Sequence, residues 1–356
     1  MIELGHLAAI GSMICSGIAT ILFKSQSDKV KPAGVNILKI VPASIAFVIT
    51  SLVIGNIQDI TNISWTAFIP LVSAAIFGIV GGDLLYLPSQ HLIGVSKAYP
   101  IGMSYPLLTY IFSMIFFKEE FKLTKFLGII IVILGISLIA SSKTTDKKTL
   151  PKKSPNIDMG LYWAMTHFDS SLNRLLETNG TKSSTSNNEP PKNEPNLSIF
   201  QQQESSSPSK KAFILGIFLA ILASFTWATG TTLIKFGLNQ TEVTIIPINT
   251  ARMLFLVPIS FSIFIGTNRG KRKSYFSKTG ILLICIGGIL GLFAGNILYL
   301  WGVDTVGPST SAAINASAPL VATPLSIIFL KEKINLRIIL GTLLTTGGIL
   351  LIILIP

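Results

Sequence analysis

The sequence predicts an all-helical membrane protein of ten transmembrane helices, arranged as two inverted five-helix repeats. Three observations lead to this prediction: the composition, ten long apolar segments, and an internal duplication at a constant spacing. Of the 356 residues, 49% are hydrophobic and only 12% are charged. Soluble domains of this length need a larger fraction of charged residues on their water-exposed surfaces. Lipid is therefore the expected solvent for most of the chain.

A helix needs about 20 apolar residues to cross a hydrocarbon core about 30 Å thick, and ten segments meet this need. They cover approximately 5–23, 35–54, 66–87, 93–117, 123–141, 212–234, 243–265, 280–301, 307–330 and 335–355. No positive charge precedes the first segment, so we interpret it as a permanent helix and not as a secretory signal. The chain is expected to divide into a first repeat, 1–141, a linker, 142–211, and a second repeat, 212–356.

The linker differs from the rest of the chain in composition. Lysine pairs, Pro190-Pro191 and the polar run Ser183–Asn188 leave little apolar surface to bury. Such segments are typical of disorder, and we expect a disordered polar tether. Four apolar residues within it fall at helical spacing: Leu161, Tyr162, Met165 and Phe168. A short helix lying on the membrane surface is therefore an open alternative.

An internal duplication is the clearest signal in the sequence. When 213 is added to each residue number from 82 to 140, 22 of the 59 positions are identical to their partners; this constant shift is called the repeat offset. The identities include Gly82 with Gly295, Tyr86 with Tyr299, Pro106 with Pro319, and Lys118-Glu119 with Lys331-Glu332. Shared lipid-facing composition does not produce matched glycines, prolines and glutamates. Because each copy has an odd number of helices, the second copy enters the membrane from the opposite face, an architecture suited to alternating access.

The repeated motifs resemble the EamA-type transporters of the drug/metabolite transporter superfamily. The resemblance rests on Gly-x-x-x-Tyr at 82–86 and 295–299, the Gly-led helix with a central proline that follows, and the Lys-Glu turns. Trp227, eight residues before Lys235, and Arg252 in the next helix add to it. It implies a secondary transporter or exporter of small polar metabolites, amino-acid-like or similar. A membrane sensor or assembly protein on the same scaffold is the alternative.

Two charged residues lie well inside predicted helices, where a charge costs about 2.5–3.5 kcal/mol or more. Arg252 either binds an anionic substrate or hydrogen-bonds the backbone of a broken or neighbouring helix. Asp83 has Asn296 as its repeat partner, so one titratable group breaks the symmetry. It is a candidate for coupling transport to a proton or another cation, or else a carboxylate solvated from the interface.

The remaining candidates are polar and aromatic. Tyr86 and Tyr299 either line a polar cavity or anchor the membrane interface. The segments 93–117 and 307–330 contain small residues, hydroxyls and prolines that free backbone carbonyls, so both are expected to line the pathway or to pack closely. The candidate substrate-binding residues are Asp83, Tyr86, Tyr99, Trp227, Arg252, Asn296, Tyr299 and Asn315.

Other charged side chains are expected to be structural. Lys24, Lys39 and Lys235 lie near segment ends and are expected to extend along the apolar surface to the lipid headgroups. Glu119 and Glu332 mark helix-to-helix corners, where a carboxylate can cap the N-terminus of the next helix.

The sequence argues against several other classes of protein. It contains no nucleophile–base pair and no phosphate-binding glycine loop, so we do not expect an enzyme. Cys15 and Cys285 have no companions at metal-ligand spacing, and we expect no metal or other cofactor. The net charge of +12 is spread over gaps between apolar segments, so nucleic acid is not an expected partner. The expected partners are a metabolite, a coupling proton or cation, and the lipid bilayer.

We expect a multi-pass protein of the cell membrane. The excess of Lys and Arg places the linker in the cytoplasm and both termini outside. The family resemblance implies cytoplasmic termini instead, and the two indications conflict.

Overall fold

The computed structural model describes residues 3–25, 32–93, 98, 101–141, 210–268, 277–330 and 336–354. Within these ranges the regular elements are all helices, as predicted. The elements of the first half are α1 (Leu4–Lys24), α2 (Pro32–Ile54), η1 (Ile57–Asn62), α3 (Trp65–Ala75), η2 (Ile76–Gly81), α4 (Gly82–Ile93), α6 (Tyr105–Phe117) and α7 (Leu123–Ala140). Those of the second half are α10 (Lys210–Leu238), α11 (Ile245–Asn268), α12 (Lys278–Gly288), η3 (Ile289–Ala294), α13 (Gly295–Thr305), α14 (Pro308–Ala316), α15 (Pro319–Leu330) and α16 (Leu336–Leu354).

Seven helical stretches of the described chain are long and apolar enough to span a membrane. They are Leu4–Phe23, Gly34–Ile54, Trp65–Tyr86, Ala212–Leu238, Ile245–Gly266, Lys278–Thr305 and Leu336–Leu354. Two shorter apolar helices, Tyr105–Phe117 and Leu123–Ile139, accompany them. The count of ten spans therefore stays a prediction, as do the domain boundaries, and the linker lies almost wholly outside the described residues.

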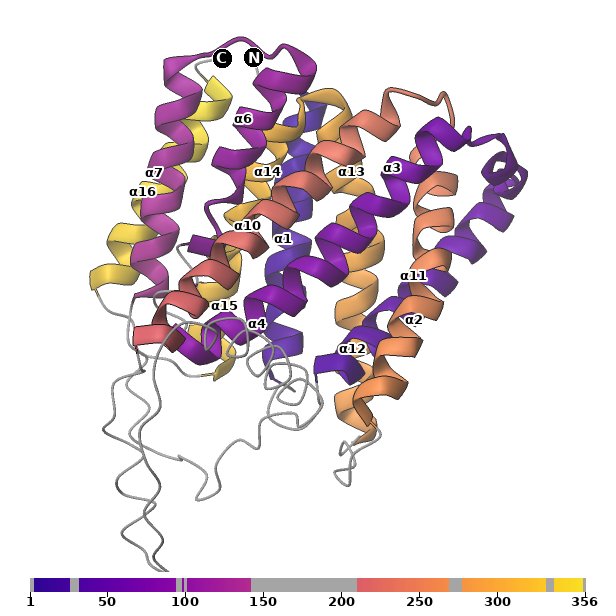
Figure 1. Ribbon diagram of the computed structural model, residues 1–356, viewed down its shortest axis with the longest axis horizontal. Helices are drawn as coiled ribbons and strands as arrows, with labels where there is room; N and C mark the ends of the chain where they lie inside the picture. Colours follow the sequence, from indigo (N-terminus) through magenta and orange to yellow (C-terminus); the bar gives the residue numbers. More distant parts are fainter. Residues whose placement is uncertain are drawn as a thin grey trace, which may run out of the picture.

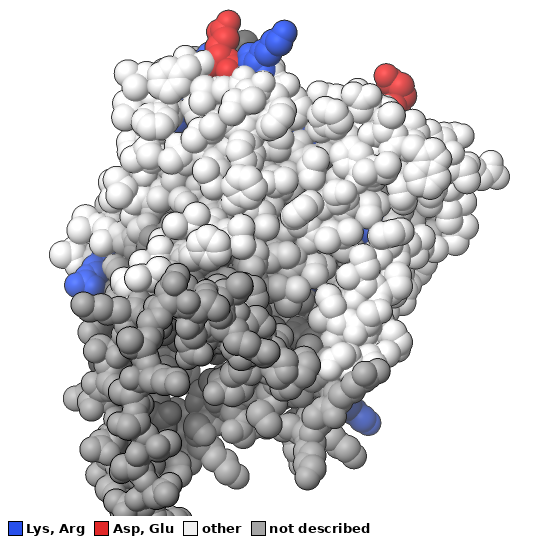
Figure 2. Space-filling view, viewed as in Figure 1, with Lys and Arg blue, Asp and Glu red and all other residues white. Residues whose placement is uncertain are grey.

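The outer surface has the character of a lipid-facing surface. Large apolar side chains such as Ile49, Phe218 and Leu343 are more than half exposed. Figure 2 shows a broad central surface with almost no charged residues and several charged side chains along the upper rim. In soluble proteins contiguous exposed apolar surface of this extent is rare, so these side chains are suited to contact lipid.

The helices pack in pairs that follow the duplication. α4 packs against α10 and its counterpart α13 packs against α1, while α2 packs against α11 and α7 against α16. In Figure 1 α1 begins and α16 ends at the upper edge, whereas α7 ends and α10 begins near the lower edge. Contacts between the two halves therefore form much of the interior.

The closest packing of the two halves is between α7 and α16. A Cβ atom on Gly135 would lie 2.7 Å from the carbonyl oxygen of Gly341, and one on Gly128 would lie 3.1 Å from that of Gly348. Glycine is needed at these positions because the backbones touch. Since the later glycine of α7 meets the earlier glycine of α16, the two helices run antiparallel. The repeat offset carries Gly128 onto Gly341 and Gly135 onto Gly348, so the two contacts are related by exchange of the halves.

A π-helical turn interrupts one long helix of each half. η2 joins α3 to α4, and η3 joins α12 to α13, and the repeat offset carries η2 onto η3. Such turns are rare and are often found at functional sites. The helices extend further than predicted, because α4 continues through Pro88 to Ile93 and α13 continues to Thr305. Asp83 and Asn296 each lie two residues after the π-helical turn of their half.

The predicted pathway segments are both broken. In the first half a turn at Met103 and Ser104 precedes α6, and in the second a turn at Ser317 and Ala318 separates α14 from α15. The turn at Ser317 and Ala318 stands directly before Pro319. In the first half one residue separates the turn from Pro106, the repeat partner of Pro319. Proline favours a break because it has no N–H to donate to the preceding turn.

Candidate functional site

Asp83 forms an ion pair with Lys39 of α2. The Lys39 Nζ lies 3.5 Å from the Asp83 Oδ2, and the ammonium also lies 5.8 Å from the centre of the Phe23 ring. The Lys39 side chain is 12% exposed and that of Asp83 is 33% exposed. The expectation that Lys39 extends to the headgroups is therefore wrong, because a carboxylate within reach stabilises its charge in the interior.

Lys235 also departs from that expectation. Its Nζ donates to the backbone carbonyl of Asp304 at 2.7 Å and lies 3.1 Å from the Asp304 Oδ1. Asp304 is near the end of α13, where unpaired carbonyls attract a cation. This pair closes a helix end and is a structural feature. The side chain of Lys24 lies outside the described part.

Arg252 occupies the position in α11 that Lys39 occupies in α2, but its surroundings differ. Only 2% of Arg252 is exposed. Its Nε donates to the carbonyl of Leu71 at 3.1 Å, and its Nη1 donates to the Asn249 Oδ1 at 2.9 Å. Asn296, the counterpart of Asp83, carries no charge to pair with it. The arrangement matches the structural interpretation of Arg252, a bond to a neighbouring helix.

Three aromatic rings gather where α10 meets α4 and α6. The centre of the Trp227 ring lies 5.2 Å from that of Tyr86 and 6.0 Å from that of Tyr105. The Tyr105 hydroxyl donates to the carbonyl of Ala312 at 3.1 Å, which ties α6 to α14. A Cβ on Gly82 would clash with the Trp227 indole, so glycine permits α4 to approach α10 here. The Gly-x-x-x-Tyr motif thus brings a ring and a close helix contact to one place.

The second half gathers polar groups at the equivalent place. The Asn315 Oδ1 accepts hydrogen bonds from Ser12 at 3.1 Å and from Ser16 at 3.4 Å, both on α1. Asn315 stands at the end of α14, just before the break. The Tyr299 hydroxyl shares a hydrogen bond of 2.8 Å with Thr231 of α10. The first helix of the first half therefore contacts a polar group of the second half, whereas the bond between Thr231 and Tyr299 lies within the second half.

Glu119 bridges the two halves at the edge where α1 begins. The Ser309 hydroxyl, at the start of α14, donates to this carboxylate, with its oxygen 2.9 Å from Oε1 and 2.8 Å from Oε2. Lys125, in the first turn of α7, pairs with the same carboxylate and lies over the Tyr110 ring. The carboxylate thus contacts the start of α14 rather than capping α7. Glu332 is outside the described ranges.

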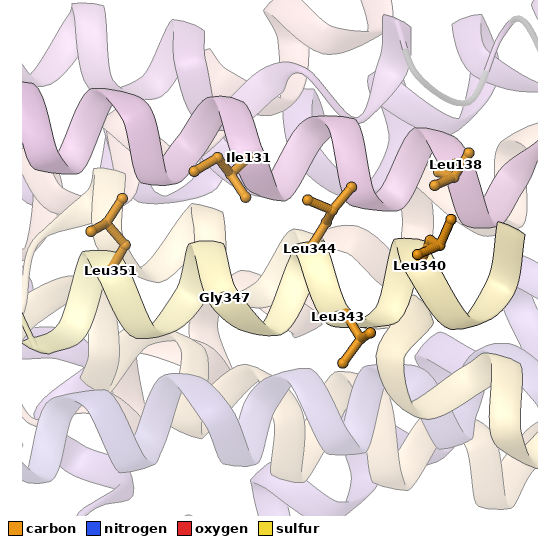
Figure 3. Close-up of a pocket in the computed structure, with 7 residues that line it drawn as sticks. All are labelled: Ile131, Leu138, Leu340, Leu343, Leu344, Gly347 and Leu351. Carbon is orange, nitrogen blue, oxygen red and sulfur yellow. The ribbon is translucent and has the colours of Figure 1, made fainter. Parts of the chain in front are cut away.

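Two hollows on the described surface are apolar, and none of these polar groups lines them. One has a volume of about 540 Å³ and lies between α7 and α16, lined by aliphatic residues and Gly347 (Figure 3). Another, of about 300 Å³, lies between α2 and α11. Both are suited to hold lipid chains and carry no chemistry. Among the described residues, no group of three or more His, Cys, Asp or Glu could hold a metal ion.

The structure brings together only some of the predicted site residues. Tyr86 and Trp227 touch, and Asp83 lies one residue beyond the glycine that contacts Trp227. Asn296, Tyr299 and Asn315 belong to the second half, and Arg252 is sealed between helices. Tyr99 lies outside the described residues. Lys39 was not predicted as the partner of Asp83, although the repeat offset pairs it with Arg252 and could have marked it.

Comparisons with known proteins agree with this arrangement. The model of the EamA-like transporter family matches residues 3–141 and 214–354. A protein of Archaeoglobus fulgidus named an uncharacterized transporter is 22% identical over 286 residues, which are 80% of this chain and 76% of that protein. A crystal structure with 12% identity superposes with a TM-score of 0.67 over 100% of this chain and 98% of the other, which supports the fold alone. Because the family match extends over both halves, the chain belongs to the EamA-like transporter family.

Proposed function

We propose that this protein is a secondary transporter or exporter that moves small polar metabolites across the cell membrane by alternating access. In this proposal α6, α7 and the broken pair α14–α15 complete ten spans with the seven long helices. The two halves are inverted five-helix repeats that exchange conformations about a site between them.

One observation supports the proposal most directly: the glycine contacts between α7 and α16. The helices are antiparallel, and the glycines of one map onto those of the other when the halves are exchanged. A contact related in this way allows either half to take the conformation of the other at little difference in energy. The matched π-helical turns η2 and η3 add a second symmetric feature near the interior.

The experiment is a release assay that assumes no substrate. Vesicles containing the purified protein are loaded with a defined mixture of amino acids, sugars, nucleobases and organic acids, and mass spectrometry identifies what leaves. The proposal expects selective loss of one chemical class, absent from protein-free vesicles. Ligand binding without any release would support the alternative of a sensor or assembly protein.

A coupling ion is a further part of the proposal. Asp83 is a candidate to exchange a proton or another cation, because its side chain is one-third exposed while its backbone lies inside a long apolar helix. Imposing a pH gradient on the same vesicles tests this role once a substrate is known.

A further inference from the structure

The contact between Glu119 and Ser309 joins α6 of the first half to α14 of the second. These helices belong to the two predicted pathway segments and pack against each other. The Tyr105 hydroxyl donates to the carbonyl of Ala312, and Ser309 donates to Glu119 at the edge where α1 begins. The breaks at 103–104 and 317–318 lie at the opposite ends of the two helices. Separating α6 from α14 at Ser309 would therefore open the space between the halves from this edge.

Glu119 is fixed to the first half by its surroundings. Lys118 ends α6 in a left-handed conformation with a φ of 55°, and the Lys122 N–H donates to the Tyr110 hydroxyl at 2.8 Å. Tyr110 is fully buried, so it ties this corner to the body of α6. Lys125 pairs with the Glu119 carboxylate from the first turn of α7. The carboxylate thus has a counterion in its own half, whether or not Ser309 is in place.

The ion pairs in the described part of the chain each lie within one half. They are Lys39–Asp83 and Lys125–Glu119 in the first half and Lys235–Asp304 in the second. Breaking a buried ion pair is costly because it leaves an uncompensated charge. Removing the Ser309 hydroxyl from Glu119 costs one hydrogen bond and leaves the pair with Lys125 intact. This contact is therefore suited to open and close repeatedly.

The opposite edge is closed in a different way. α10 begins near that edge (Figure 1), and there Gly216 packs on Ile93 at the end of α4. A Cβ on Gly216 would clash with the Ile93 side chain, so this contact between the halves is apolar and close. Alternating access requires one edge to open while the other stays closed. The two edges therefore offer separate contacts whose opening can be measured independently.

We propose that the contact between Glu119 and Ser309 is a releasable latch, which holds α14 against α6 and keeps the pathway closed at the edge where α1 begins. Lys125 compensates the Glu119 carboxylate after Ser309 has moved away. The inference rests on the proposed transport function, because the latch opens each time the pathway opens at this edge.

The test measures amide hydrogen exchange by mass spectrometry on the purified protein in lipid nanodiscs. Exchange reports how often a backbone segment opens. Ser309→Ala removes the hydroxyl and leaves the pair between Glu119 and Lys125. We expect exchange in α14 to become about tenfold faster, the factor that corresponds to loss of one hydrogen bond to a charged group. Exchange in residues 85–93 of α4, at the opposite edge, should not become faster.

Two further variants connect the effect to the latch. Ser44→Ala is the matched control, because Ser44 is also buried but donates to the carbonyl of Ile40 within α2, and it should leave exchange in α14 unchanged. Glu119→Gln weakens the latch from the other side and should also speed exchange in α14. Adding Ser309→Ala to Glu119→Gln should then have little further effect, since both changes act on one contact. Unchanged exchange in α14, or equal acceleration at both edges, overturns the proposal.

The outcomes separate this inference from the proposed function. Faster exchange confined to α14, with no release of any solute from vesicles of the unaltered protein, would keep the latch and overturn transport. Release by the unaltered protein, with exchange in α14 unaffected by Ser309→Ala and Glu119→Gln, would keep transport and overturn the latch.

Discussion

The two halves of this protein share a backbone plan but differ in the charges they hold. The first half carries a partly buried ion pair between Lys39 of α2 and Asp83, which lies two residues after a π-helical turn. The second half carries Arg252 and Asn296 at the equivalent positions, and its cation is sealed by bonds to a carbonyl and an amide. The contrast shows that duplication preserved the backbone plan, whereas the charged residues and their partners differ between the two copies.

The largest expected effect comes from removing the carboxylate of the first half. Asp83→Asn makes this position match Asn296 and leaves Lys39 without a counterion. We expect a tenfold or greater loss of solute accumulation driven by a pH gradient in vesicles, because the group that exchanges a cation is gone. Unchanged dependence on the gradient would show that Asp83 is not the coupling group.

A second variant tests whether position matters as much as charge. The exchange Asp83→Asn with Asn296→Asp keeps one carboxylate but moves it to the second half. Since Arg252 is already occupied, we expect no recovery of gradient-driven accumulation. Recovery would mean that the two halves are chemically interchangeable.

Exchanging the two cations gives the next largest effect. Arg252→Lys keeps the charge, but a single ammonium is not expected to reach both the Leu71 carbonyl and Asn249 in the geometry of the planar guanidinium. Loss of one bond from a buried charged group costs about 1.5–3 kcal/mol, so the melting temperature of the purified protein should fall. Lys39→Arg should change the melting temperature little, because Asp83 accepts either cation. Equal effects of the two variants would contradict the contrast between Arg252, which is buried and holds two hydrogen bonds, and Lys39, which is partly buried and forms an ion pair with Asp83.

The packing of the two halves provides a matched pair of glycine variants on α16. A Cβ on Gly341 would lie 2.6 Å from the carbonyl of Gly135, so Gly341→Ala should destabilise the protein by about 1–3 kcal/mol. Gly347 faces open space, and Gly347→Ala should be neutral or stabilising by about 0.5–1 kcal/mol, since alanine favours helix. Thermal melting in detergent measures both. Similar melting of the two variants would argue against close contact of α7 and α16.

The smallest expected effect concerns the hydroxyl of Tyr299. Tyr299→Phe removes the hydrogen bond with Thr231 between α13 and α10, which is worth about 0.5–1.5 kcal/mol. A modest fall in melting temperature with intact solute accumulation is expected. A loss of accumulation equal to that of Asp83→Asn would place Tyr299 in the transport site instead.

Much of the fold could be predicted from two features of the sequence. The length of an apolar segment indicates a helix from local sequence alone, and the duplication is visible as identities at a fixed shift. The apolar segments and the helical class follow from composition, and the matched glycines of α7 and α16 follow from the repeat. The π-helical turns could not be predicted, because nothing in the composition of Ile76–Gly81 distinguishes it from ordinary helix. Helix ends were also misplaced, since Pro88 lies within α4 and does not end it.

The site was harder to predict than the fold because its contacts join distant parts of the chain. Asp83 stood out through its asymmetry with Asn296, but its partner Lys39 was assigned to the headgroups from its position near a segment end. Ser309 meets Glu119 across 190 residues, and sequence spacing gives no sign of that contact. Charges inside a membrane are best interpreted in pairs, and the pairs become visible only in three dimensions.

The central claim is that the two halves move relative to each other during transport, and the bridge between Glu119 and Ser309 allows a direct measurement. In a variant with Glu119→Cys and Ser309→Cys, a short bifunctional methanethiosulfonate would join the halves at this edge. Uptake into vesicles of the solute found in the release assay is compared before linking, after linking and after reduction, with the single-cysteine variants as controls. We predict that linking abolishes uptake and that reduction restores it. Continued uptake by the fully linked protein would contradict the claim.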